Sequence, residues 1–522
     1  MTATYSSPLP ESSPRINDGA SASNEHITSG RLLARNVLWN IVGTCSPILV
    51  AIICLPILKR ALGTERLGII TLAWVIVGYF GMFDLGLSRA LTKLVAERLG
   101  RKQAAEIVPL IWTSLFLLIA IGATGALIAL YLTPWIVERM LKVPLDLQHQ
   151  TLVAFYWVSA SIPFVVITAG LRGVLEALQQ FRLATWIRVP MGIFTYVGPV
   201  ALLPFTHNLE PILALLVIGR IVACAAHAFA SFYALPGLKH GISFQRSALG
   251  PLLSFGSWMT VSNVLGPLMV TFDRFVIGAM ISMSAVAYYA VPYEAVIKIT
   301  LFPAALIGVL FPAFSTAGAQ DRNRLALLCD AGTRYLFIVL FPAILILVAF
   351  APDGLRLWLG TDFALKSTPV VRWLAVAVFI NALAQVPSAH LQSAGRPDIT
   401  AKLHALEVPV YTVLLFTLVR TMGITGAALA WALRVILDAV FLFVFSHRFL
   451  PENRIVFPRL PLMVAAALAI FGALTMPMGL SSRIVLVFFL TTIGVVASWF
   501  WLMSDRERTA FQMRLRRRNA HS

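Results

Sequence analysis

Charged side chains inside long apolar stretches are the most informative residues of this sequence. Glu294 and Lys298 are four residues apart, and Arg434 and Asp438 repeat that spacing, so each pair lies on one face of a helix. An ionisable group at membrane depth is costly unless it is paired or hydrated. Each pair is therefore either a static bridge between helices or part of a site for a charged ligand.

Two further apolar stretches contain cations. Asp273 and Arg274 are adjacent, at a depth where helical register can bring them near Glu294, although a structural role near the outer interface is the alternative. Arg220 is nearly alone in its stretch, with His227 two turns away. A guanidinium without a carboxylate partner suits a phosphate, because it donates two parallel hydrogen bonds. Helix packing or snorkelling is the alternative for Arg220, and His227 is more typical of a packed residue.

These patterns define a candidate binding site. The predicted cavity-lining cations are Arg220, Arg274, Lys298 and Arg434, and the predicted charge partners or gating residues are Asp84, Arg89, Asp273, Glu294 and Asp438. Asp84 and Arg89 lie near the inner face of the membrane. A role at a helix end explains these two residues as well as a role in a cytoplasmic gate does. We predict no catalytic residue, no cofactor and no metal ligand.

Membrane-spanning helices carry these charged residues. Hydrophobic residues make up 59% of the 522 residues, charged residues only 12%, and the mean hydropathy is +0.84. A span needs about 20 mostly apolar residues. We expect fourteen such spans, at 36–57, 67–88, 107–132, 151–170, 186–204, 211–235, 252–280, 286–312, 333–351, 368–388, 404–420, 424–446, 459–478 and 482–503.

The expected fold is an all-α integral membrane protein with two six-helix lobes around a central cavity and two additional helices. The predicted segments are a disordered cytoplasmic tail (1–30), an N-terminal lobe (31–237), a cytoplasmic amphipathic linker (238–249), a C-terminal lobe (250–450), two extra spans (451–504) and a basic cytoplasmic tail (505–522). A weak likeness between spans one and two and spans seven and eight supports the division into halves.

The distribution of Lys and Arg predicts the orientation. The formal net charge of +18 arises from basic residues in short breaks between apolar segments, which argues for topology and against nucleic-acid binding. Most of these basic residues lie on the side of the N-terminus, so we expect both termini to be cytoplasmic. Lys59, Arg60 and Arg66 run against this trend.

Short segments of the chain resemble a known family. They are 62–68 (LGTERLG), 83–90 (FDLGLSRA), 170–177 (GLRGVLEA), 273–278 (DRFVIG), 311–315 (FPAFS), 392–397 (QSAGRP) and 424–428 (ITGAA). In order and spacing they resemble Wzx-type polysaccharide or O-antigen flippases of the multidrug/oligosaccharidyl-lipid/polysaccharide exporter superfamily. The segments extend over most of the chain, which makes the series more specific than any one of them.

The resemblance implies a function. Such a flippase moves undecaprenyl-diphosphate-linked oligosaccharide from the cytoplasmic to the periplasmic leaflet of the bacterial inner membrane, by alternating access. The glycan then serves O-antigen, capsule or exopolysaccharide biosynthesis, and a polysaccharide polymerase and a chain-length regulator are candidate partners. The lipid bilayer is also a partner, because it surrounds the protein along the whole translocation path.

Other classes remain as alternatives. A lipid II flippase has the same span count and a similar substrate head, and a multidrug/cation antiporter of the same superfamily is a second rival. A membrane glycosyltransferase or polymerase is the least favoured, because the outer loops are short and contain no DxD or ExD carboxylate pair. An ATP-driven pump is disfavoured because no GxxxxGK[ST] segment occurs.

Overall fold

The computed structural model describes residues 30–497, except 82, 83, 85, 102, 240 and 450–459. The predicted tails at 1–30 and 505–522 lie outside these residues, apart from Gly30. The described chain folds into helices and short connections, as expected for a chain surrounded by lipid, where backbone groups must find hydrogen-bond partners within the protein.

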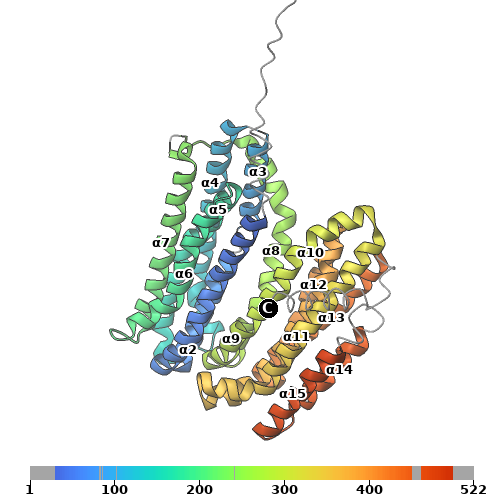
Figure 1. The fold of residues 1–522 in the computed structure, drawn as a ribbon. Coiled ribbons are helices and arrows are strands. Elements are labelled where there is room, and N and C mark those ends of the chain that lie inside the picture. The colour runs from blue at the N-terminus through green and yellow to red at the C-terminus, as the bar shows by residue number, and fades with distance from the viewer. Residues whose placement is uncertain are drawn as a thin grey trace, which may run out of the picture.

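The N-terminal lobe is a bundle of helices that lie side by side (Figure 1). It contains α2 (Gly30–Phe80), α3 (Leu87–Gly100), α4 (Ala104–Trp135) with a π-helical turn (Ile136–Met140), α5 (Leu145–Ala177), α6 (Phe181–Leu202) and α7 (Leu209–Ala234). A short 3₁₀ turn, Pro236–Lys239, follows α7. Residues 246–249 of the predicted linker already belong to the next helix.

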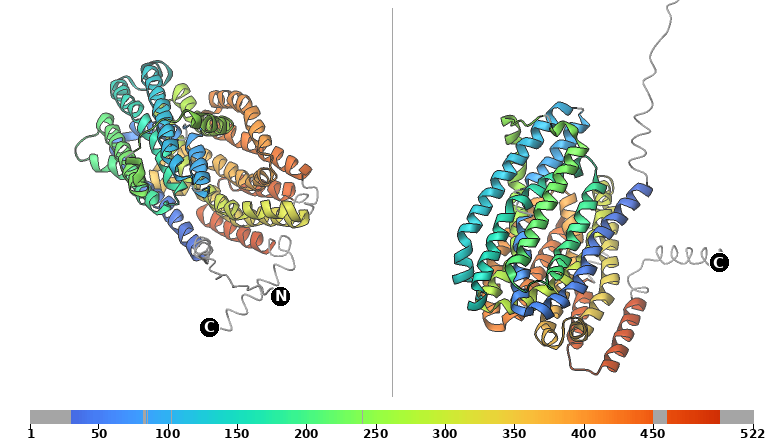
Figure 2. Two further views of the ribbon diagram at one scale, coloured as in Figure 1. Left: turned by 90° about the horizontal axis from the view of Figure 1, so that it is seen from above. Right: turned by 90° about the vertical axis from the view of Figure 1, so that its left-hand side faces the viewer.

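The C-terminal lobe lies opposite, and the view from above separates the two groups (Figure 2). It contains α8 (Arg246–Met280), α9 (Met283–Ile297), a 3₁₀ turn (Lys298–Thr300), α10 (Leu301–Gln320), α11 (Arg322–Leu359), α12 (Thr361–Ser393) and α13 (Pro397–Phe449). Two final helices, α14 (Leu460–Ala473) and α15 (Leu480–Ala497), pack against α11.

The predicted spans overlap these helices. Each of the fourteen ranges overlaps a helix, and in α2 and in α13 the break between two ranges contains a glycine. Gly63 (φ +80°) and Gly423 (φ +61°) adopt backbone conformations that residues with a Cβ rarely adopt. Among the described residues, eight helices are long and apolar enough to cross a membrane. The chain is therefore an all-α, multi-pass membrane protein.

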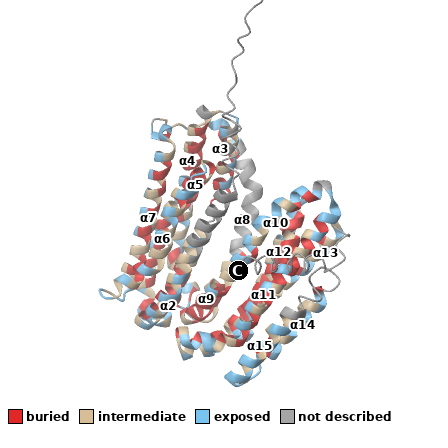
Figure 3. Ribbon diagram, in the orientation of Figure 1, coloured by how far each residue is buried: buried red, intermediate tan, exposed pale blue. Residues whose placement is uncertain are grey.

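The packed core is richest on α11 and α12, where buried residues follow one another along each helix (Figure 3). Phe341 of α11 stacks on Phe471 of α14, with ring centroids 5.7 Å apart. Arg483 of α15 donates to Asp353 of α11 at 2.5 Å. The last two helices are therefore fastened to the C-terminal lobe, on the side away from the N-terminal lobe (Figure 1).

One group of contacts between the lobes lies at the end formed by the kink of α2 near Gly63, the turn between α8 and α9, and the end of α11. The indole nitrogen of Trp358 donates to the carbonyl oxygen of Ile52 at 2.7 Å. The ammonium of Lys142 donates to the Met280 carbonyl at 2.6 Å. Gly68 of α2 lies directly against the backbone of Met283. We call this end of the molecule the closed end. At the opposite end, the first turns of α8 pack against α3 and α4.

Candidate functional site: a cationic cavity between the lobes

A cavity of about 840 Å³ lies between the two lobes. Its wall is formed by α2, α5, α6 and α7 from the N-terminal lobe and by α8, α9 and α11 from the C-terminal lobe. Trp358, which bridges the lobes at the closed end, contributes to the lining. Ligand pockets are commonly found at such lobe interfaces.

The charges of the lining are mostly positive. Arg172, Arg220, Arg274 and Lys298 line the cavity, and Glu294 is the carboxylate among the described lining residues. The remaining wall is largely aliphatic and aromatic. Because an apolar wall weakens screening, these cations attract an anion more strongly than they would on an open surface.

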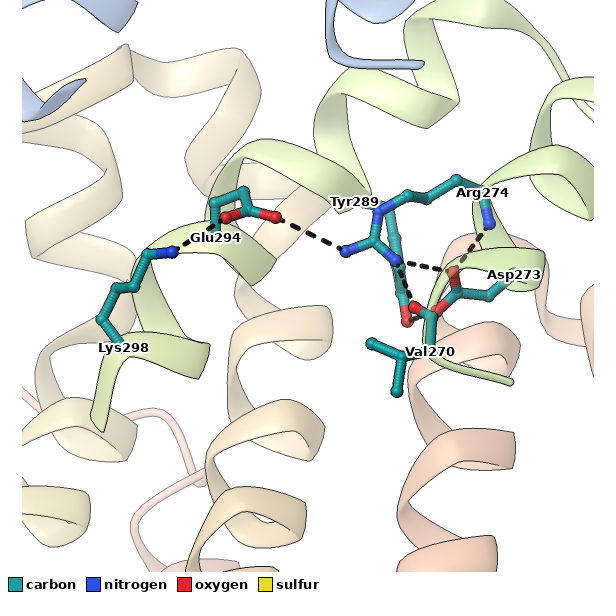
Figure 4. A network of polar contacts seen from close by, with 6 residues as sticks. All are labelled: Val270, Asp273, Arg274, Tyr289, Glu294 and Lys298. Atoms are coloured by element: carbon teal, nitrogen blue, oxygen red, sulfur yellow. Dashed lines mark hydrogen bonds and ion pairs between the residues drawn. The ribbon is translucent and has the colours of Figure 1, made fainter. Parts of the chain in front are cut away.

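Arg274 is held by a buried network (Figure 4). Its guanidinium lies 2.9 Å from the Asp273 carboxylate and donates to the Val270 carbonyl at 2.5 Å. The hydroxyl of Tyr289 donates to the other oxygen of Asp273 at 2.5 Å. Asp273 is fully buried and Arg274 is 1% exposed, so this pair satisfies the requirement that buried charges be paired.

The network continues into the cavity through Glu294. One carboxylate oxygen of Glu294 lies 3.8 Å from the Arg274 guanidinium, and the other accepts a hydrogen bond from Lys298 at 3.3 Å. The Arg274 guanidinium also lies over the ring of Tyr293, 4.1 Å from its centroid. The four residues Asp273, Arg274, Glu294 and Lys298 therefore form one chain of alternating charge (Figure 4).

Arg220 differs from the other lining cations. It projects from α7 into the cavity lining, and it has no ion pair with any residue that the structure describes. Arg172, by contrast, lies 3.5 Å from Glu176 on the same helix. An arginine without a carboxylate partner keeps its donors available, which is the condition for bidentate phosphate binding.

Several lining residues are absent from the predicted site. Arg172 is one of them, although it lies in one of the family segments. Trp74 of α2 and Tyr196 of α6 also line the cavity, with ring centroids 5.1 Å apart in an edge-to-face arrangement. In the sequence, aromatic residues at such positions cannot be distinguished from ordinary core residues, so no sequence signal identifies them as cavity-lining residues.

Arg434 does not line the cavity. It lies behind it, in a second polar cluster within α13, where its Nε is 3.9 Å from a Glu407 oxygen. Asp438, its predicted partner, lies 3.9 Å from His404 instead. Glu407 and His404 fall inside the predicted span 404–420, so the sequence contains an intramembrane carboxylate that is absent from the predicted site residues.

The remaining predicted residues have structural contacts. The carboxylate of Asp84 accepts hydrogen bonds from the backbone N–H groups of Gly86 and Ser88, at 3.0 and 3.1 Å, which stabilises the start of α3. Arg89 is exposed on α3. His227 is buried, and its Nδ1 lies 2.8 Å from the carbonyl of Ala223. These contacts fit the helix-end and packing interpretations.

The fold defines the class of protein. The chain superposes on the lipid II flippase MurJ with a TM-score of 0.69, at 14% identity, over 89% of this chain and 99% of that structure. It superposes on an inward-facing multidrug resistance transporter of the MATE family with a TM-score of 0.67, at 15% identity, over 79% and 98%. The fold is that of the transporters of the MOP superfamily.

The sequence defines the family. Residues 33–317 match the model for the polysaccharide biosynthesis protein family. The chain belongs to this family, the Wzx-type flippases of the MOP superfamily, which confirms the resemblance seen in the motifs.

Two relatives are similar over most of the chain. It is 31% identical to a Shigella flexneri protein named "Putative O-antigen transporter", over 78% of this chain and 96% of that one. It is 22% identical to a Haloferax volcanii protein named "Probable low-salt glycan biosynthesis flippase Agl15", over 73% and 76%.

Proposed function

We propose that this protein is a flippase for glycans linked to undecaprenyl diphosphate. The substrate has an anionic, strongly hydrated head that cannot enter hydrocarbon, whereas its polyprenyl tail can remain in lipid. The cavity offers such a head four basic side chains in a wall that is otherwise largely apolar. Names of two relatives, an O-antigen transporter and a glycan flippase, support the same substrate class.

The observation that carries the proposal is Arg220. Arg274 and Lys298 share Glu294, and Arg172 is close to Glu176, so each of these cations is partly neutralised. Arg220 has no such partner among the described residues and lines the same cavity. In our proposal it is the main anchor of the diphosphate, and Arg274, Lys298 and Arg172 complete the positive field around it.

The proposed mechanism is alternating access in a bacterial inner membrane. With the predicted orientation, in which both termini are cytoplasmic, the closed end faces the periplasm. The structure then corresponds to a state that accepts substrate from the cytoplasmic leaflet. Separation of Trp358 from Ile52 and of Lys142 from Met280 would open the opposite side. The released glycan unit would then be available to a polysaccharide polymerase and a chain-length regulator.

The charge of the cavity weighs against one rival. A cationic drug would meet four basic side chains and a carboxylate that is already paired, so a multidrug antiporter is disfavoured. The charge of the cavity does not distinguish the proposed function from that of a lipid II flippase, because the substrate of a lipid II flippase also carries a diphosphate. The sugar portion of the substrate must distinguish the two.

The test is transport by purified protein in proteoliposomes. We expect translocation of an undecaprenyl-diphosphate-linked oligosaccharide, measured as access of an external glycan-modifying enzyme to the sugar. Lipid II and a cationic dye serve as comparison substrates. Translocation of lipid II alone, or of the dye alone, would contradict the proposal.

A further inference from the structure

A second polar cluster lies within α13, outside the cavity. His404, Glu407 and Asp438 each present one ligand atom, and these atoms all lie within 4.8 Å of one another. The helix folds back at Gly423, which brings the 404–407 turn beside the 434–438 turn. Glu407 and Asp438 are each 5% exposed, so two carboxylates lie together in the interior of a membrane protein.

The cluster has an unbalanced charge. Arg434 contributes one positive charge, with its Nε 3.9 Å from Glu407, while the two carboxylates contribute two negative charges. Both oxygens of Glu407 and Oδ1 of Asp438 lack a hydrogen-bond partner among the described residues. Buried carboxylates in a native structure normally accept hydrogen bonds, so an uncompensated charge here points to a missing positive ligand.

We propose that His404, Glu407 and Asp438 form a binding site for one proton, and that proton binding there is coupled to glycan-lipid translocation. One proton on the cluster balances the formal charge when the imidazole is neutral. The coupling part of this inference rests on the proposed function, whereas the proton site itself does not.

The composition of the site favours a proton over a metal ion. Hard cations such as Na⁺, Mg²⁺ and Ca²⁺ need several oxygen ligands, whereas Arg434 already occupies one side of the carboxylates. The next group beyond the guanidinium is the thioether of Met269, 3.6 Å from Nη1. A proton needs only the two carboxylates or the imidazole, which are present.

His404 connects the buried carboxylates to the protein surface. Its side chain is 36% exposed, and its Nε2 lies 3.9 Å from the buried Asp438 carboxylate. His404 is also seven residues from the start of α13, on the side where the predicted orientation places the cytoplasm. An imidazole at such a boundary can pass protons between water and a buried acid.

Aromatic residues connect this site to the cavity network. Trp431, three residues before Arg434, lies edge-to-face with Tyr293, with centroids 5.8 Å apart. Tyr293 in turn supports the Arg274 guanidinium. The charged groups that act on Glu407 and Asp438 are His404, Arg434 and each other. Tyr411 of α13 lies beside the cluster, with its ring 5.9 Å from the Arg434 guanidinium, and it interacts in turn with Asp273 and Arg274 of α8 and with Tyr293 of α9. His390 of α12 contacts Ser446, two turns beyond Asp438.

The first arm of the test detects the proton directly. Infrared difference spectroscopy of the full-length protein in nanodiscs, titrated from acidic to alkaline pH, reports the C=O band of protonated carboxylic acids. We expect a protonated carboxyl at neutral pH in the wild type, lost in Glu407→Gln and in Asp438→Asn. Asp398→Asn, an exposed change on the same helix, is the matched control and should retain the band. Absence of the band in correctly folded wild type, or its retention in both cluster variants, would overturn the proposal.

The second arm tests coupling. In proteoliposomes, an imposed proton gradient should change the rate of glycan-lipid translocation by the wild type, and this response should be lost in Glu407→Gln and Asp438→Asn. A response to a sodium gradient in its place, with Na⁺ displacing the proton from the cluster, would overturn the assignment to a proton. A third outcome is that neither the wild type nor the variants translocate the glycan lipid while the infrared band behaves as expected. In that case the proposed function is wrong and the proton site is retained.

Discussion

At the scale of single residues, the cavity is built from cations of two kinds. Arg274 is rigid, because Asp273, the Val270 carbonyl and the Tyr293 ring fix its guanidinium. Arg220 lines the same cavity without an ion pair among the described residues. A rigid cation shapes the positive field, and a cation with available donors can bind and release an anion, so the two arginines have different tasks.

The Asp273–Arg274 pair should contribute mainly to stability. Asp273→Asn leaves the buried guanidinium with Glu294 at 3.8 Å and a carbonyl as partners. Removing one member of a buried pair typically costs about 3 kcal/mol or more. We expect a loss of about 3 kcal/mol in unfolding free energy, measured by denaturant titration in mixed micelles. Stability equal to that of the wild type would mean that the pair is not enclosed as described.

Glu294 should limit how tightly the cavity holds an anion, since it shares its charge between Arg274 and Lys298. Glu294→Gln removes the carboxylate that both cations share, while Arg274 keeps Asp273 as its other partner. Partly exposed pairs of this kind are worth up to about 1 kcal/mol, so binding of undecaprenyl diphosphate should tighten about two- to fivefold. The measurement is equilibrium binding to protein in nanodiscs, with Glu138→Gln, at an exposed carboxylate outside the cavity lining, as the control. Weaker binding by Glu294→Gln would contradict this role.

At the scale of helices, the lobes meet through a close approach of backbones. An ideal Cβ built on Gly68 of α2 would lie 1.9 Å from the carbonyl oxygen of Met283 on α9. Only a residue without a Cβ permits this contact. The closed end therefore depends on Gly68, in addition to the hydrogen bonds of Trp358 and Lys142.

Gly68→Ala should disfavour the closed end. The methyl group meets backbone that cannot rotate away, so the helices must separate, at a cost of about 1–3 kcal/mol. We expect faster reaction of a membrane-impermeant thiol reagent with Met280→Cys in a cysteine-free background. Gly354→Ala, where nothing lies within 4 Å of the built Cβ, is the control and should leave the reaction unchanged. An equal rate for both glycine variants would refute the dependence on Gly68.

The helices themselves could be predicted from the sequence, because each apolar stretch has the length that a bilayer demands. The rotation of each helix about its axis could not. Arg434 and Arg220 were both predicted to line the cavity, yet Arg434 faces Glu407 and only Arg220 of the two is a lining residue. The four-residue spacing of Glu294 and Lys298 predicted their contact. The ion pair between Glu294 and Arg274 could not be predicted, because it depends on how α8 and α9 pack.

At the scale of the whole molecule, transport requires the lobes to change their relative position. Lys142 belongs to the N-terminal lobe and Met280 to the C-terminal lobe, and they are joined at the closed end. A reversible cross-link between Lys142→Cys and Met280→Cys, in a cysteine-free background, should stop translocation, and cleavage of the link should restore it. Undiminished translocation by fully cross-linked protein would exclude opening at this end.

In our proposal, Arg220 anchors the diphosphate of a lipid-linked glycan inside the cavity. The most direct measurement is the translocation rate of undecaprenyl-diphosphate-linked oligosaccharide in proteoliposomes that contain wild type, Arg220→Gln, Arg220→Lys or Arg182→Gln. Arg182 is an exposed arginine of α6 outside the cavity lining, so its variant controls for loss of charge alone. A charge-assisted hydrogen bond is worth about 1.5–3 kcal/mol, so Arg220→Gln should be slower by about 10- to 100-fold. Arg220→Lys should be intermediate and Arg182→Gln unchanged. Translocation by Arg220→Gln at the wild-type rate would show that Arg220 does not anchor the diphosphate.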